Sequence, residues 1–272
     1  LIENLPIRQP DRHLERRGPA VSAAFGPDGT PTKAAEGFAR SCGVAVADLQ
    51  RQETDKGAWL VQVSREPGAP TADLIPGIVT NALAGLPIPK RMRWGDRDDE
   101  FVRPVHWAVL LFGDEVIPAT ILGVQTDRLT RGHRFHCPEP IRLTAPTEYA
   151  RQLAETGKVI ADFSERRDVV RTQAEAAAAE LGGVAVIRAE LLDEVTALVE
   201  WPVALAGNFE RRFLDVPAEA LISTMQDHQR YFPVVDGHGR LLPHFITITN
   251  LVSRDPAQVR AGNERVIRPR FS

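Results

Sequence analysis

The stretch "VPAEALISTMQDHQRYFPVVDGHGRLLPHFITITN", residues 216–250, decides which fold to expect. Pro217 suits the first turn of a helix, and a strand pattern follows from Tyr231. "DGHG" is a strong turn signal, and "HFITITN" alternates polar and apolar residues as a strand does. Helices packed beside antiparallel hairpins predict an α+β fold.

The same two patterns run along the rest of the chain. Helices are predicted over residues 31–42, 71–86, 146–157, 162–181, 189–200 and 255–270. Strands are predicted over residues 1–5, 57–66 and 141–144, and a hairpin over residues 102–124 turns at Gly113 and Asp114. Residues 8–19 and 87–101 are dense in charge, proline and glycine, which predicts loops.

Several residues define the expected helices more closely. Asp162 with Glu165 resembles a capping box, and Pro76 is tolerated only in the first turn of its helix. In the helix of residues 189–200 one apolar stripe is expected. Its members are Leu191, Leu192, Val195, Leu198 and Val199. Near the end of the helix of the opening stretch, Leu221, Ile222 and Met225 are expected to face the core. Four residues are expected to face solvent, namely Gln226, His228, Gln229 and Arg230.

The 272 residues are enough for one or two domains, with 43% hydrophobic and 25% charged residues as in ordinary globular proteins. Hairpin signals give way to helices near residue 145. This change predicts a mixed part at residues 1–145 and a second part at residues 146–272, unless the two form one domain. The net charge of −3 excludes a polycation, so any nucleic-acid surface must be a local patch.

The chain carries no apolar run near the ~20 residues that span a bilayer, and no signal peptide is visible. Two distant cysteines, Cys42 and Cys137, make no disulfide framework and favour the cytoplasm. The chain opens without Met and stops without a tail signal, so we expect it to be a piece of a longer protein.

The segment "TRGHRFHCPEP", residues 130–140, is the densest in chemically active side chains. His133, His136 and Cys137 offer ligands to a metal, but a zinc site needs a fourth ligand or a water on a separate arm. Cys137 as a nucleophile would need partners from elsewhere in the fold. A polar loop is the simpler interpretation, and neither nucleotide-binding glycine motif occurs in the chain.

Clusters of basic residues with aromatic neighbours are the remaining signal. Arginine and aromatic rings on glycine-bearing loops suit RNA, because guanidinium groups bind phosphate and rings stack on bases. The alternative is that these are solvated charges, partly paired with Asp96, Asp98, Asp99 and Asp127. The clusters are Lys90, Arg91, Arg93 and Trp94; Arg128, Arg131, His133, Arg134 and Phe135; and Arg260, Arg265, Arg268 and Arg270.

An ordered series of motifs covers essentially the whole chain. It includes "PTKAAEGFAR", "PKRMRWG", "FVRPVHW", "TRGHRF", "VIADFSERR", "LLDEVTALVEWPV", "TMQDHQRYFPV", "LLPHFITITN" and "GNERVIRPR". In this order the series resembles the β subunit of the heterotetrameric bacterial glycyl-tRNA synthetases, in its N-terminal part. Where that family often has a basic residue after Met225, this chain has Gln226.

The resemblance implies an α2β2 assembly in which the α subunits activate glycine with ATP and magnesium. It implies that the β subunit contacts glycine tRNA, the α subunit and a second β subunit, with no membrane. It also implies a fold similar to the editing-type domain of the phenylalanyl-tRNA synthetase β subunit. It assigns no catalytic residue, no metal and no cofactor to this chain.

From the clusters and the resemblance together, we expect certain residues to contact tRNA or a partner. Two other roles stay open, a hydrolytic editing domain that acts on mischarged tRNA and a purely structural scaffold for the α subunits. The contact candidates are Lys90, Arg91, Arg93, Arg131, His133, Arg134, His228, Arg230, Tyr231, Arg268 and Arg270.

Overall fold

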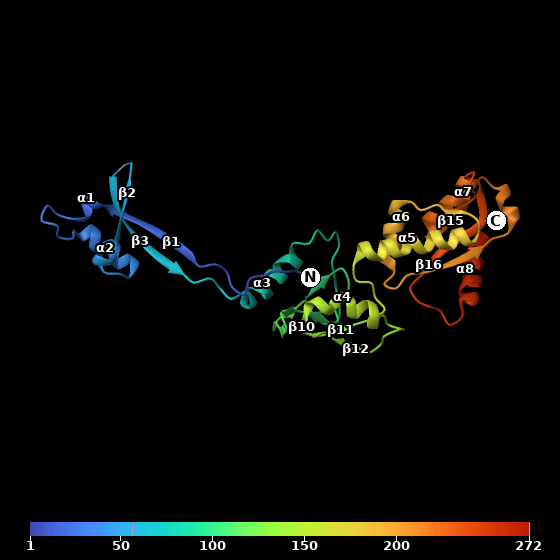
Figure 1. Ribbon diagram of the computed structural model, residues 1–272, viewed down its shortest axis with the longest axis horizontal. Helices are drawn as coiled ribbons and strands as arrows, with labels where there is room; N and C mark the ends of the chain where they lie inside the picture. The colour runs from blue at the N-terminus through green and yellow to red at the C-terminus, as the bar shows by residue number, and fades with distance from the viewer. Residues whose placement is uncertain (56, 272) are drawn as a thin grey trace. The chain divides into compact units, whose positions relative to one another are not determined.

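The structure is a computed structural model that describes residues 1–55 and 57–271. The chain divides into two compact units, one of residues 2–89 and one of residues 90–272 with Leu1. Figure 1 follows the chain through both. The boundary predicted near residue 145 lies inside the second unit, and it stays a prediction.

The first unit is a small sheet with helices. In chain order its elements are β1 (Arg12–Ala20), α1 (Val21–Ala24), α2 (Lys33–Cys42), the 3-10 turn η1 (Val46–Asp48), β2 (Gln50–Thr54), β3 (Gly57–Glu66) and α3 (Thr71–Ala84). The strands pair antiparallel in the order β1-β3-β2. Ala24, Ala35 and Leu60 are buried together, so α1 and α2 pack on the Leu60 face of β3.

Two predictions for the start of the chain, a loop and a strand, are wrong. Residues 12–19, predicted as part of a charged loop, belong to β1, which pairs with β3 from Arg12 opposite Glu66 onward. Backbone pairing with β3 stabilises a charged strand whose side chains stay exposed. Residues 1–5, predicted as a strand, form none.

Both predicted helices of the first unit are confirmed. Thr32 precedes α2, and Gly43 follows it with a left-handed φ of 71°, as expected for a helix that ends at glycine. Pro76 is the sixth residue of α3 and so lies in the second turn, not in the first. Its missing N–H removes one hydrogen bond to the carbonyl of Ala72 without ending the helix.

The second unit opens with short strands. They are β4 (Met92–Arg93), β5 (Glu100–Phe101), β6 (Ala108–Val109), β7 (Leu111–Phe112), β8 (Glu115–Val116), β9 (Thr120–Ile121), β10 (Val124–Asp127), β11 (Leu129–Arg131) and β12 (Pro140–Arg142). The predicted loop of residues 87–101 contains the β4-β5 pair, so this prediction is wrong in part.

The hairpin predicted over residues 102–124 is only partly confirmed. β7 and β8 pair around the predicted turn, where Gly113 has a φ of 63°. The predicted return strand breaks because the chain turns again at Leu122 and Gly123, with φ of 48° and 74°. β9 and β10 therefore form a second hairpin, and β10 also pairs parallel to β6.

The rest of the second unit is helical at first and then mixed. Its elements are η2 (Pro146–Glu148), α4 (Tyr149–Gln152), the π turn η3 (Leu153–Gly157), α5 (Phe163–Glu180), β13 (Val184–Ala185), α6 (Ala189–Leu198), β14 (Val203–Asn208), η4 (Arg211–Asp215), α7 (Ala218–Ser223), the π turn η5 (Thr224–His228), β15 (Phe232–Val235), β16 (Leu241–Thr249) and α8 (Pro256–Phe271). The four strands pair antiparallel in the order β13-β15-β16-β14.

This four-stranded sheet buries both of its faces. Ile246 of β16 packs with the buried side of α5 and α6, including Val170 and Leu192. Phe245, the neighbouring residue, points to the other face and packs with Met225 and Ile267 of η5 and α8. Figure 1 shows α5 lying along this sheet. The alternation of "HFITITN" thus separates two apolar cores rather than a core from solvent.

Helix boundaries in this part follow the predicted signals. The Asp162 carboxylate accepts a hydrogen bond from the Glu165 N–H at 2.8 Å, which caps α5. Gly182 has a φ of 72° just beyond the end of α5. Of the stripe predicted for α6, Leu191, Leu192, Val195 and Val199 are buried, but Leu198 is 64% exposed. The prediction for Leu198 is wrong because α6 ends at this residue, and the extended backbone at Val199 turns Val199 into the core instead.

The predicted α+β class is confirmed by these antiparallel sheets and helices. The similarity to an editing-type domain stays a prediction. Within residues 1–55 and 57–271, no helix combines the length and the apolar character needed to cross a bilayer.

Candidate nucleic-acid interface

Residues 131–137, called the 131–137 loop below, start at the end of β11 and lead toward β12. Arg131 lies opposite Pro140 in the β11-β12 pair, so the loop has a fixed base. The Cys137 N–H donates to the His133 carbonyl at 2.8 Å, which closes a turn within the loop. Both ends of the loop are therefore held by backbone hydrogen bonds.

His133 lies inside the loop with only 2% of its surface exposed. Its Nδ1 accepts N–H groups from Phe135 at 3.2 Å and His136 at 3.4 Å. A nitrogen that accepts carries no proton, so Nε2 holds the proton and donates to the Asn250 carbonyl at 2.5 Å. His133, expected to contact RNA or a partner, instead binds the loop to the end of β16.

Asn250 extends this connection to a third segment. Its side-chain Oδ1 accepts the N–H groups of Glu200 at 2.6 Å and Trp201 at 3.0 Å, just after α6. The Val252 N–H donates to His136 Nε2 at 3.1 Å. The loop is thus tied to the segments after β16 and after α6, although more than 100 residues separate it from Asn250 in the chain.

Gly132 allows the backbone to approach Gly157 closely. A Cβ on Gly132 would lie 2.6 Å from both the Cα and the carbonyl oxygen of Gly157. The His133 N–H donates to that same carbonyl at 2.7 Å. Gly132 has no positive φ, so the lack of a side chain serves the close approach to Gly157 and not a left-handed backbone.

Three side chains of the loop point outward. Arg131 and Arg134 are exposed, and Phe135 is 71% exposed. Within the part of the chain that the structure describes, neither arginine has a carboxylate within ion-pair distance. A rigid loop therefore presents two unneutralised guanidinium groups and one aromatic ring.

The basic cluster at residues 90–94 differs from the loop in its partners. Arg93 lies 3.2 Å from the Asp98 carboxylate, so the pairing considered as an alternative is confirmed for this residue. Lys90 is exposed and Arg91 is half-buried. An exposed pair of this kind contributes little to stability and leaves Arg93 able to exchange partners.

A surface pocket of about 440 Å³ lies beside this cluster. Trp94 and Val105 supply apolar walls. Asp96, His106 and Gln125 supply polar groups, and the Arg97 guanidinium donates to the carbonyl of Gly123 at its edge. The sequence indicated the basic residues here but not the pocket, because the β9-β10 turn that completes it lies far along the chain.

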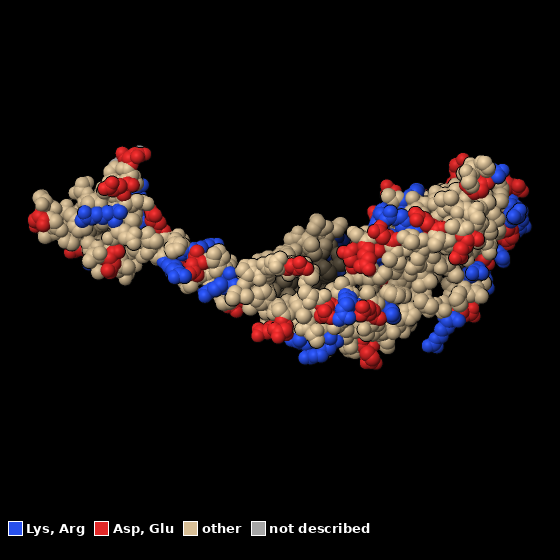
Figure 2. Space-filling view, in the orientation of Figure 1, with Lys and Arg blue, Asp and Glu red and all other residues tan. Residues whose placement is uncertain are grey.

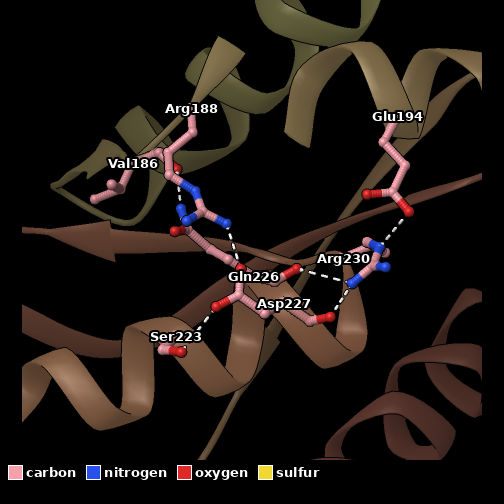
Figure 3. A network of polar contacts seen from close by, with 7 residues as sticks. All are labelled: Val186, Arg188, Glu194, Ser223, Gln226, Asp227 and Arg230. Carbon is pink, nitrogen blue, oxygen red and sulfur yellow. Dashed lines mark hydrogen bonds and ion pairs between the residues drawn. The ribbon is translucent and has the colours of Figure 1, made fainter. Parts of the chain in front are cut away.

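Residues 226–231, called the 226–231 turn below, hold the second group of candidates (Figure 3). The π turn η5 inserts an extra residue, so that Gln226 follows Met225 into the interior and is 2% exposed. Its amide Nε2 donates to the Val186 carbonyl at 3.0 Å. The prediction that Gln226 faces solvent is wrong.

Arg188, beside the 226–231 turn, and Arg230, within it, each form an ion pair with a carboxylate. Arg188 lies 2.5 Å from Asp227, which also accepts the Ser223 hydroxyl at 2.8 Å. The hydrogen bond from Arg188, aided by that from Ser223, lowers the pKa of Asp227. Arg230 has a left-handed φ of 60°, and its Nε lies 2.6 Å from Glu194. Figure 3 shows Arg188 beside Asp227 and Arg230 beside Glu194.

The remaining predicted contact residues are placed differently again. Tyr231 is 4% exposed, stacks on Phe245 at 4.5 Å and donates its hydroxyl to Asn263 at 2.6 Å. Burial raises its pKa. It is a core residue here, whereas the neighbouring His228 is exposed.

Two arginines of α8 are held locally. Arg268 lies 2.9 Å from Glu210, and Arg270 donates to the Val266 carbonyl at 2.6 Å. On the face shown in Figure 2, basic and acidic side chains are intermixed rather than gathered into one broad basic patch. Among the described residues, Lys90 and Arg270 likewise have no carboxylate within ion-pair distance. Arg131 and Arg134 differ from them because they lie together on one hydrogen-bonded loop beside the exposed Phe135 ring.

The metal site considered for His133, His136 and Cys137 does not form among the described residues. Among the described residues, no three His, Cys, Asp or Glu side chains gather as metal ligands. His136 accepts a backbone N–H, and Cys137 lies near the Glu139 carbonyl. What the loop can do is bind anions and stack on flat groups.

Comparison with known proteins gives consistent similarities. A family model described as glycyl-tRNA synthetase beta subunit matches residues 1–272. The chain is 58% identical over 271 residues to the glycine–tRNA ligase beta subunit of Hahella chejuensis. It is 56% identical over 272 residues to that of Marinobacter nauticus and 54% identical over 271 residues to that of Edwardsiella ictaluri. These matches cover 100% of this chain, which spans 39% of the length of each relative.

Proposed function

Since this chain belongs to the family of glycyl-tRNA synthetase β subunits, we propose that it acts as part of a glycine–tRNA ligase. In that role it supports the ATP-dependent attachment of glycine to tRNA. It does so by binding tRNA and by packing against neighbouring domains and subunits. The aminoacylation site itself lies outside this chain.

The partners follow from the same premise. They are the α subunit, glycine tRNA and a second β subunit in an α2β2 assembly. ATP and magnesium act at the α subunit, so this chain needs no cofactor of its own. Such an enzyme works in the cytoplasm, where tRNA, glycine and ATP are available.

The observation that carries tRNA binding is the pair of unneutralised arginines on the 131–137 loop. A guanidinium group without a carboxylate partner can bind phosphate without first breaking an ion pair. The buried His133 keeps the loop in one conformation, so little conformational entropy is lost when RNA binds. Arg131 and Arg134 are therefore the first residues to test as phosphate contacts.

A salt titration of tRNA binding tests this proposal. The full-length β subunit, assembled with α, is compared with the double variant Arg131→Ala, Arg134→Ala by filter binding of glycine tRNA. Log affinity falls as log salt concentration rises, and each lost phosphate contact makes this slope less steep by about 0.7 to 0.9. For the double variant we expect weaker binding and a slope less steep by about 1 to 2.

The matched control is Arg240→Ala, which removes an arginine that Asp236 already neutralises. We expect it to bind tRNA as the unchanged enzyme does. If the double variant also keeps the full affinity and the full salt slope, the phosphate role of the loop is wrong. Loss of α2β2 assembly in that variant would instead favour the scaffold role.

A hydrolytic editing role is the second candidate, and the pocket beside Trp94 favours it. A volume of about 440 Å³ with His106 and Asp96 in its lining could hold a small aminoacyl group. Glycine is the smallest amino acid, so size exclusion already rejects larger ones and lowers the need for editing. Incubating the assembled enzyme with alanyl-tRNA for glycine tests this role. Deacylation that is lost in His106→Ala would support it, and hydrolysis no faster than in buffer would exclude it.

A further inference from the structure

Phe135 is the most exposed aromatic side chain of the 131–137 loop, at 71%. Most of its ring meets solvent although the loop around it is densely bonded. A single exposed apolar side chain is common on protein surfaces. This one lies on a hydrogen-bonded loop beside two arginines, and aromatic residues are enriched where proteins bind partners. The question is what this ring meets.

The backbone that carries the ring is held in place by hydrogen bonds. The backbone N–H of Phe135 donates to Nδ1 of the buried His133, and the two rings lie 6.0 Å apart. The His133 N–H is itself bonded to the Gly157 carbonyl at 2.7 Å. The backbone that carries Phe135 is therefore fixed before any ligand arrives.

The charge around the ring is positive. Arg134 precedes Phe135 directly, Arg131 lies at the base of the loop, and residues 128–138 contain no Asp or Glu. The Arg128 guanidinium donates to the Asp114 carbonyl at 2.6 Å, so it is already used inside the fold. Arg131 and Arg134, both exposed, remain for a ligand that carries negative charge next to a flat group.

An unpaired nucleotide has this combination of features. Its base offers a flat face to the ring, and its two flanking phosphates offer negative charge to the arginines. Paired bases are stacked on each other inside a helix, so a duplex offers no free face. A protein partner would have to bring carboxylates to both arginines and an apolar pocket to the ring.

We propose that Phe135 is a stacking platform for one unpaired nucleotide of the bound tRNA, with Arg131 and Arg134 holding the adjacent phosphates. This inference rests on the tRNA-binding function proposed above. It adds to that function the class of ligand, which is an unpaired nucleotide. It also adds the residue Phe135, which binds the flat face of the base by stacking.

The test separates stacking from charge. The full-length β subunit assembled with α is titrated with glycine tRNA, with single-stranded oligoadenylate and with a blunt RNA duplex. Phe135→Ala is expected to weaken tRNA and oligoadenylate binding by about 5- to 150-fold, the range for loss of one stacked base. Duplex binding and the salt slope of tRNA binding are expected to stay unchanged, because no charge is removed.

Two further variants make the result specific. Phe135→Trp keeps a flat ring and is expected to restore tight binding. Phe163→Ala removes another exposed phenylalanine, 42% exposed at the start of α5, and is expected to bind all three RNAs normally.

Three outcomes would overturn the inference. Oligoadenylate binding unchanged in Phe135→Ala would show that the ring meets no base. An equal loss for duplex and single strand would point to damage of the loop. Failure of α2β2 assembly with normal tRNA affinity of the assembled fraction would make Phe135 a protein contact. The proposed function fails separately, when the Arg131 and Arg134 variants bind tRNA unchanged.

Discussion

The 131–137 loop and the 226–231 turn each contain histidine, arginine and an aromatic residue, yet the fold places these residues in opposite ways. In the loop His133 is buried, and Arg131 and Arg134 have no carboxylate partner among the described residues. In the turn His228 is exposed, while Arg230 is neutralised by Glu194. The difference teaches that the elements around a basic cluster, and not its residue types, decide which arginines keep a carboxylate partner.

Gly132→Ala should have the largest effect, because it attacks the base of the loop. The added Cβ would meet backbone atoms of Gly157 at 2.6 Å, and backbone can give way only by a shift of the strand end. We expect the free energy of unfolding of the β subunit to fall by about 3 kcal/mol. Urea denaturation measures it.

The control for this variant is Gly237→Ala in the turn before β16, where a Cβ meets nothing within 4 Å. It should change stability by less than about 0.5 kcal/mol. Equal stability of the two variants would contradict the close approach of residues 132 and 157.

His133→Ala is expected to have the next largest effect. It removes the donor to the Asn250 carbonyl and the acceptor for two N–H groups, which together should lower stability by about 2 kcal/mol. The loosened loop should also bind glycine tRNA more weakly. Thermal unfolding and filter binding measure the two effects.

His228→Ala is the matched variant in the 226–231 turn, where the imidazole is exposed. Its stability should be unchanged within about 0.5 kcal/mol. If His228→Ala destabilises the protein as much as His133→Ala does, the difference between the buried and the exposed histidine is contradicted.

Gln226→Ala tests whether the 226–231 turn contributes to stability and not to tRNA binding. It leaves the carbonyl of the half-buried Val186 without its side-chain donor, so stability should fall by about 1 to 2 kcal/mol. Affinity for glycine tRNA should not change, since the amide is 2% exposed. Gln258→Ala on the exposed start of α8 is the control for stability. Weaker tRNA binding in Gln226→Ala, with folding intact, would mean that the turn does meet RNA.

The smallest expected effect is a pH dependence at Asp227. Its pKa is lowered from 3.8 in the folded protein by hydrogen bonds from Arg188 and Ser223. The folded state thus favours the ionised carboxylate, and this contribution is complete above pH 3.8 and is lost as pH falls through the lowered pKa. The stability difference between the unchanged protein and Asp227→Asn should therefore shrink on acidification below pH 4. A constant difference between pH 6 and pH 3 would contradict this assignment.

Local signals predicted the fold well where neighbours in sequence make the structure. Asp162 caps α5, Gly43 ends α2 and the hairpin turn at Gly113 forms as predicted. These features depend on bonds within a few residues, so the residue types alone determine them. The charged strand β1 was missed, because its stability comes from pairing with a strand some 50 residues away.

The candidate site divides in the same way. The sequence identified the candidate residues of the 131–137 loop and the 226–231 turn, and it identified the family. It could not tell which arginines have carboxylate partners, or that His133 is buried and His228 exposed. Tyr231 carries no local sign of its stacking on Phe245, which depends on how β15 and β16 pair. The pocket beside Trp94 likewise needs the turn at Gly123 to close it.

The sequence by itself determined the helices with clear caps, the turns with their glycines, the α+β class and the family. Only the tertiary structure decided which histidine braces a loop, which arginines are neutralised and which ring stays exposed. The physical reason is distance along the chain. Whether a side chain is buried or paired depends on atoms that folding brings together, as His133 and Asn250 meet across 117 residues.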